Sequence, residues 1–137
     1  ITLTITAFNL IWFILRRLGL RALFVRASDT AAFAERYGRR LTLDISHSKL
    51  SANYAKRPFS EYVELLAPYA DHLHLVDSVG VDGEGVQIGE GEIDWPALAA
   101  QLDRLCPDAS FIPEIWQGHL SRGAGFVEGL RRLEAFL

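Results

Sequence analysis

Residues 72–77 read His-Leu-His-Leu-Val-Asp, and residues 88–95 read Ile-Gly-Glu-Gly-Glu-Ile-Asp-Trp. The first segment alternates apolar and polar side chains, a pattern that predicts a strand. The second ends in Asp94-Trp95 and is followed by Pro96, which predicts a helix start because aspartate accepts from the unpaired N–H groups of a first turn. Two imidazoles and the carboxylate of Asp77 at this crossing exceed what a structural connection needs, so we expect a site here.

Strands and helices alternate along the rest of the chain. The predicted strands cover residues 1–8, 41–45, 73–76 and 110–115. Helices are expected after Ser28-Asp29-Thr30, after Ser60 and after Asp94, and Phe126, Leu130, Leu133 and Leu137 line a final amphipathic helix. Gly38, Pro68 and Cys106-Pro107 are expected to end the first three helices. Residues 46–57 and 80–91 are predicted to be loops.

Strands that alternate with helices indicate an α/β fold with a parallel sheet and right-handed crossovers. The spacing suits an open doubly wound sheet or part of a (β/α)8 barrel. A full barrel takes about 250 residues, whereas this chain has 137 and offers four βα units, half of a barrel. Half a barrel leaves two open sheet edges, which predicts self-association or a missing N-terminal barrel half.

Composition and charge favour one soluble domain over residues 1–137. The formal net charge of −3 leaves no broad basic surface, so a nucleic-acid partner is not expected. The single cysteine, Cys106, permits no internal disulfide and suggests the cytoplasm.

The N-terminal segment 1–27 differs from the family-like remainder, 28–137, in its long apolar run over residues 9–25. Arg16, Arg17 and Arg21 interrupt that run, which argues against a membrane span, and the position of the charges argues against a signal peptide. A buried or partner-covered segment is expected, with an interfacial helix as the alternative.

Three residues share one position in the predicted sheet: Asp44, His74 and Glu114 lie at or near the carboxyl ends of neighbouring strands. In parallel α/β folds these ends converge on the ligand. Two carboxylates and one imidazole suit a divalent cation such as Mn²⁺, Mg²⁺, Co²⁺ or Zn²⁺. Each residue also has a structural alternative, as a turn cap, an interior histidine or an arginine partner.

Further candidates surround these three. His47 and His119 follow two of the strand ends and can bind substrate hydroxyls or phosphate or shuttle a proton, with an exposed loop histidine as the structural alternative for each. Arg122 can bind an anionic substrate, and Asp77 can orient the metal ligand His74 or cap a turn. The other acidic residues of the glycine-rich segment, which are Asp82, Glu84, Glu90, Glu92 and Asp94, are predicted to form a solvated face.

At these residues the chain resembles the xylose isomerase-like TIM-barrel superfamily, which includes sugar phosphate isomerases and epimerases and the type 2 AP endonucleases related to endonuclease IV. The resemblance covers residues 41–137. Besides the two segments quoted above, it rests on Leu-Asp-Ile-Ser-His at 43–47 and Ile-Pro-Glu-Ile-Trp at 112–116. It implies that these units are the C-terminal half of the barrel.

The resemblance also implies roles for individual residues. Asp44, His74 and Glu114 match metal ligands, and His47 matches a histidine that contacts the substrate. Glu114 matches the second of two glutamates that exchange a proton at the substrate carbon. No carboxylate stands at the expected position of the first, residues 6–8, and Gly80 lies near the place of an arginine that sugar epimerases carry.

Three functions follow from this reading. The leading one is a divalent-metal-dependent isomerase or epimerase that moves a proton next to the carbonyl of a sugar or sugar phosphate. The first alternative is a half barrel without catalytic activity that serves as an interaction or fusion segment. The second is a phosphoesterase of the endonuclease IV type, which needs further ligands and a basic track that the sequence does not offer.

Overall fold

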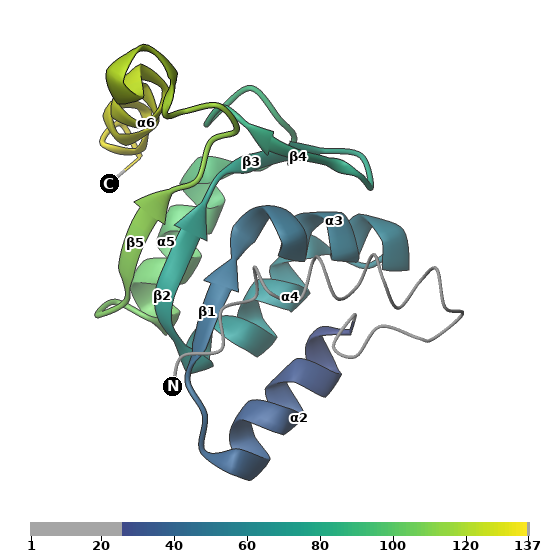
Figure 1. The fold of residues 1–137 in the computed structure, drawn as a ribbon. Helices are drawn as coiled ribbons and strands as arrows, with labels where there is room; N and C mark the ends of the chain where they lie inside the picture. Colours follow the sequence, from purple (N-terminus) through teal and green to yellow (C-terminus); the bar gives the residue numbers. More distant parts are fainter. Residues whose placement is uncertain (1–25, 137) are drawn as a thin grey trace, which may run out of the picture.

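A parallel three-stranded sheet in the order β1-β2-β5 lies at the centre of residues 26–136, the part of the chain that the computed structural model describes (Figure 1). The strands are β1 (Leu41–Asp44), β2 (Ala70–Leu75) and β5 (Ser110–Pro113). Asp44 pairs with His74 across β1 and β2, and His74 pairs with Ile112 across β2 and β5. The three strands therefore end side by side at one edge of the sheet.

The predicted α/β class and the parallel pairing are confirmed in this part of the chain. The strand predicted over 41–45 ends one residue earlier, and β5 is shorter than the predicted 110–115. β2 begins at Ala70, before the predicted 73–76, because its first residues pair with β1. The strand predicted over residues 1–8 lies outside the described residues.

Helices cover the sheet and its upper edge. They are α2 (Ala27–Tyr37), α3 (Ile45–Ala55), α4 (Phe59–Leu66), α5 (Trp95–Leu105) and α6 (Leu120–Leu133), with a 3₁₀ turn η1 at Ala67–Tyr69. α4 and α5 lie behind the sheet (Figure 1). Leu43 and Leu73 of the strands and Val63 and Leu98 of these helices are buried in the same core. Burial of this apolar surface is the main favourable term that holds the layers together.

Local signals set several helix ends as predicted. The Asp94 side chain accepts from the backbone N–H of Ala97 at 3.1 Å and caps α5. Gly38 ends α2 in the left-handed region, with φ of 57°. α4 ends at Leu66, and Pro68 falls in the 3₁₀ turn that follows.

Two predicted helix starts are wrong. Ser28, Asp29 and Thr30 lie inside α2, whose N-cap is Arg26 with an extended backbone and no side-chain cap. Ser60 lies inside α4, which begins at Phe59 after Pro58. Burial of Ala27 and Ala31 against the core explains the earlier start of α2, because packing outweighs the loss of one cap.

The loop predicted over residues 46–57 is also wrong, because this segment forms most of α3. Asp44 caps this helix by accepting from the backbone N–H of His47 at 2.9 Å. The buried side is made of Ile45, Ser46, Ser48 and Ala52, all but the first of them small. Small polar residues give no apolar periodicity, which is why the pattern concealed this helix.

A β-hairpin forms over residues 77–86 and includes the first part of the predicted glycine-rich loop 80–91. Its strands are β3 (Asp77–Val79) and β4 (Gly83–Val86), which pair antiparallel. The hairpin crosses above α3 (Figure 1), where Asn53 donates to the backbone oxygen of Gly80 at 2.6 Å. The prediction of a loop was wrong for this part. Glycines have low strand propensity, so the local pattern did not indicate strands, and the contact with α3 stabilises the hairpin.

β5 is an edge of the sheet within residues 26–136, and its Phe111 and Ile112 are 40% and 43% exposed. Proteins generally cover apolar strand edges. Self-association or a further barrel half remains a prediction.

No helix within residues 26–136 has both the length and the apolar character that a membrane span requires. The apolar run 9–25 lies outside the described residues.

Candidate metal centre

Asp44 is the last residue of β1 and is buried. Its Oδ1 accepts from the backbone N–H of His47, as the cap of α3 requires. Its Oδ2 lies 3.9 Å from His74 Nδ1. One oxygen therefore holds the carboxylate in place, while the other faces the neighbouring strand.

His74 lies beside Asp44 on β2, and its Nδ1 is 2.7 Å from Glu114 Oε2. Glu114 follows β5 directly, and its backbone N–H donates to the oxygen of Leu75 at 3.2 Å, which continues the contact between β2 and β5. The register of three strands thus brings three separate chain segments to one point. The prediction that these side chains converge is confirmed.

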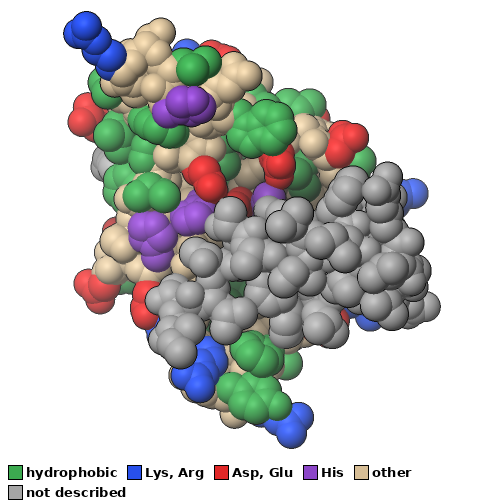
Figure 2. Space-filling view, in the orientation of Figure 1, with side chains coloured by type: hydrophobic (Ala, Val, Ile, Leu, Met, Phe, Trp, Pro, Cys, Tyr) green, Lys and Arg blue, Asp and Glu red, His purple; other side chains and the backbone are tan. Residues whose placement is uncertain are grey.

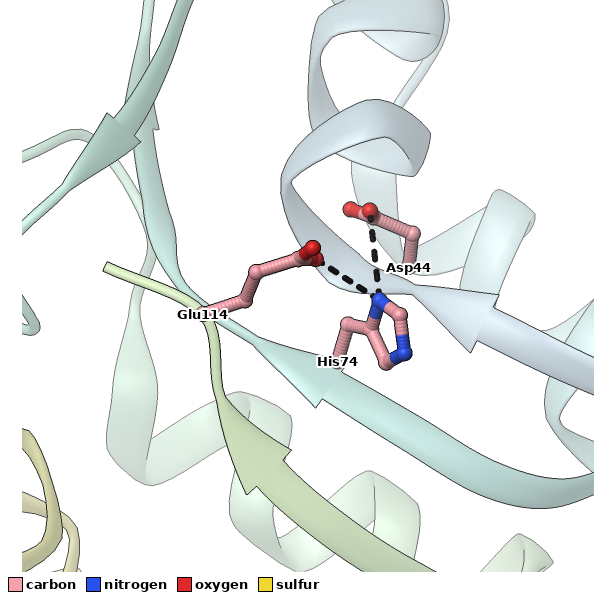
Figure 3. Close-up of side chains that lie close together, drawn as sticks. All are labelled: Asp44, His74 and Glu114. Atoms are coloured by element: carbon pink, nitrogen blue, oxygen red, sulfur yellow. Dashed lines mark ion pairs between the residues drawn. The ribbon is translucent and has the colours of Figure 1, made fainter. Parts of the chain in front are cut away.

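Figure 3 shows the three side chains pointing toward one another from adjacent strand ends. One ligand atom from each residue lies within 4.8 Å of the other two. A divalent ion about 2.0–2.2 Å from each ligand would bring donor atoms to comparable separations. Two carboxylates and an imidazole are a donor set for Mn²⁺, Mg²⁺, Co²⁺ or Zn²⁺. Asp44, His74 and Glu114 therefore fit a divalent metal.

His47 stands beside this cluster in the first turn of α3. Its Nε2 lies 2.8 Å from Glu84 Oε2 on β4 and 4.0 Å from Asp44 Oδ2. The hairpin is therefore tied by a polar contact to the helix that Asp44 caps. The sequence predicted Glu84 as part of a solvated face. Its contact with His47 was not predicted, because it depends on the hairpin, which was also not predicted.

His119 and Arg122 lie in the exposed turn at the start of α6. Ser121, Arg122 and Gly123 adopt left-handed backbone conformations there. Within residues 26–136, no hydrogen bond or ion pair joins His119 or Arg122 to the three candidate ligands. Their roles in substrate binding remain predictions.

Asp77 is fully buried at the start of β3, and its contacts are with the glycine-rich loop. Its carboxyl accepts from the backbone N–H groups of Ser78, Gly89 and Ile93 at 2.8, 3.0 and 3.1 Å. It also accepts from the indole N–H of Trp95 at 2.8 Å. In the described part of the chain these four donors, and not His74, are its hydrogen-bond partners, which supports the turn-capping alternative.

His72 provides a natural comparison with His74. The two rings lie edge to face, with centroids 5.5 Å apart, and share one side of β2. His72 Nδ1 lies 2.8 Å from Ser110 Oγ, away from the three candidate ligands. The two histidines thus lie on the same side of β2 but have different partners: His74 contacts the candidate ligands and His72 contacts Ser110.

Replacing His74 with alanine is expected to weaken Mn²⁺ binding at least about 100-fold, because loss of residues that merely orient ligands already costs about 10–100-fold. His72→Ala is the matched control and should bind Mn²⁺ as the unchanged protein does. Calorimetric titration of both variants measures this difference. Equal losses in the two variants would contradict the assignment of His74 as a ligand.

Comparison with protein families bears on the whole of this region. A family model described as xylose isomerase-like TIM barrel matches residues 19–136. The match contains all three candidate ligands and each described strand and helix. No curated protein matches the sequence significantly.

Proposed function

Because the chain belongs to the xylose isomerase-like TIM barrel family, we propose that it binds a divalent metal and acts on a sugar or sugar phosphate as an isomerase or epimerase. The observation that carries this proposal is the meeting of Asp44, His74 and Glu114 at three adjacent strand ends. In barrels of parallel strands this end of the sheet is where active sites form.

Asp44, His74 and Glu114 would hold the metal, which when bound polarises the carbonyl and hydroxyl oxygens of a substrate. The side chains of Asp44 and His74 are only 8% and 9% exposed, whereas that of Glu114 is 41% exposed. Glu114 is therefore the ligand whose carboxylate a substrate carbon can reach. This difference supports Glu114 as the residue that transfers the proton, with Asp44 and His74 as groups that would only hold the metal.

A single carboxylate suffices for one of the two family reactions. In aldose–ketose isomerisation, Glu114 takes the proton from the hydroxyl-bearing carbon and returns it to the former carbonyl carbon on the same face. The hydroxyl proton passes meanwhile from one oxygen to the other. Epimerisation needs proton donors on both faces, and no carboxylate stands at residues 6–8, where the family resemblance predicts the other one. The residues in hand therefore favour isomerisation.

The same sequence fact favours one alternative function. A domain that lacks the first of the two family glutamates can bind a metal and a ligand without converting the ligand to product. Binding would then persist while proton transfer is absent. An assay that follows the proton directly separates the two functions.

We expect the Mn²⁺-loaded protein to catalyse deuterium incorporation from D₂O at the carbon next to the carbonyl of a ketose or aldose. Proton NMR of a panel of pentoses and hexoses, each with and without a terminal phosphate, measures the exchange. Removal of the metal with a chelator should abolish it. Metal binding without exchange on any of these compounds would support the non-catalytic alternative.

A further inference from the structure

Trp116 stands two residues beyond Glu114, on the segment that leaves the candidate metal centre. Trp116 is 67% exposed, although the preceding residue, Ile115, is buried. An exposed indole presents a large apolar surface to water, a cost that a binding role would offset.

The position of this indole is fixed by the β-hairpin. The backbone N–H of Trp116 donates to the oxygen of Gly85 on β4 at 3.0 Å. The Trp116 side chain lies against Gly85, where an added Cβ atom would overlap the Cβ, Cγ and Cδ1 atoms of the tryptophan. Gly85 also has a φ of 78°, which other residues rarely adopt. Glycine at this position therefore makes room for the ring.

The glycine that the indole covers is next in sequence to a polar residue of this region. Gly85 is adjacent to Glu84, whose carboxylate contacts His47 at 2.8 Å, and His47 follows the cap residue Asp44. Figure 2 shows hydrophobic, acidic and histidine side chains gathered on one face of the molecule. The hairpin and the segment after β5 thus form two sides of the same region.

We propose that Trp116 is the stacking wall of the candidate site and binds the C–H face of a sugar, an inference that rests on the proposed function. The face of an aromatic ring is electronegative and attracts C–H groups made slightly positive by neighbouring oxygens. Carboxylates such as Glu84 and Glu114 accept hydrogen bonds from hydroxyls and repel phosphate. The part of the substrate on the indole is therefore an uncharged polyol chain or ring.

Two probes test this placement with the Mn²⁺-loaded protein. D-Fructose offers a carbonyl next to a hydroxyl together with a polyol chain that can cover the indole. Hydroxyacetone offers the carbonyl and hydroxyl alone and is too short to stack. Ligand-observed NMR titration gives the Kd of each probe for the unchanged protein, for Trp116→Ala and for Trp116→Phe.

Trp116→Ala should weaken D-fructose binding about 3- to 10-fold, the range of an aromatic stacking contact, and leave hydroxyacetone binding unchanged. Trp116→Phe should recover most of the D-fructose affinity. Mn²⁺ affinity and the melting temperature should be the same in all three proteins, which excludes a purely structural effect.

The inference is overturned if Trp116→Ala binds D-fructose as tightly as the unchanged protein, or loses both probes equally. It is also overturned if the Mn²⁺-loaded unchanged protein binds neither probe. Binding of D-fructose that depends on Trp116, without deuterium exchange, would support the wall and reject the isomerase. Deuterium exchange that persists in Trp116→Ala, with unchanged D-fructose affinity, would support the isomerase and reject the role of Trp116 as a wall.

Discussion

Replacing Glu114 with glutamine is expected to slow deuterium exchange by about 10²–10⁴-fold, the usual contribution of a positioned acid or base. Glutamine keeps the shape of the side chain but cannot take up a proton. The change also removes one of the two carboxylates of the metal centre, so exchange should be measured at saturating Mn²⁺. The half-exposed position of Glu114 at the end of β5 is the reason to expect the effect here.

Glu61→Gln is the matched control. Glu61 lies on α4 behind the sheet and pairs with Arg57 at 2.6 Å, so its loss should leave exchange unchanged. The metal content of both variants should be determined beside the rates. An exchange rate in Glu114→Gln that stays within a factor of three of the unchanged protein, at equal metal occupancy, would remove Glu114 from the mechanism.

The second large effect is on stability. Asp77→Ala is expected to lower the free energy of unfolding by at least about 4 kcal/mol, since four donors lose their acceptor and each unsatisfied buried group costs about 1–3 kcal/mol. Domains of this size have about 5–15 kcal/mol in total, so loss of the cooperative transition is consistent with this expectation. Urea unfolding followed by circular dichroism makes the measurement.

Asp94→Ala is the comparison for this change. Asp94 also accepts a backbone hydrogen bond, but only as the exposed cap of α5, so its loss should cost about 1 kcal/mol. A loss below about 1 kcal/mol in Asp77→Ala would show that the loop does not depend on this carboxyl. Gly91 lies against Asp77 so closely that a Cβ would overlap Oδ1, which explains a glycine at that position.

Several features could be predicted because their causes are local. The cap at Asp94, the left-handed Gly38 and the alternation in β2 each depend on residues a few positions apart. The candidate ligands were predictable for a related reason: parallel strands end at a common edge, so residues at strand ends meet. Asp44, His74 and Glu114 required only that the strands be identified and paired.

Other features could not be predicted, because distant contacts decide them. Helix α3 has no apolar periodicity and is set by its cap and by burial of small side chains. Strand β4 of the hairpin contains two glycines, which have low strand propensity, and the hairpin is held by Asn53 and His47 of α3. Glu84 therefore reaches the site only in the folded chain.

By itself, the sequence determined the α/β class, the approximate positions of the strands and the candidate ligands at their ends, since short-range patterns and strand polarity encode them. The tertiary structure decided which polar groups contact one another. It hydrogen-bonded the Asp77 side chain to the glycine-rich loop, brought His47 to Glu84 and placed the Trp116 side chain against Gly85. These contacts join segments far apart in the chain, and their geometry depends on packing, which no local pattern records.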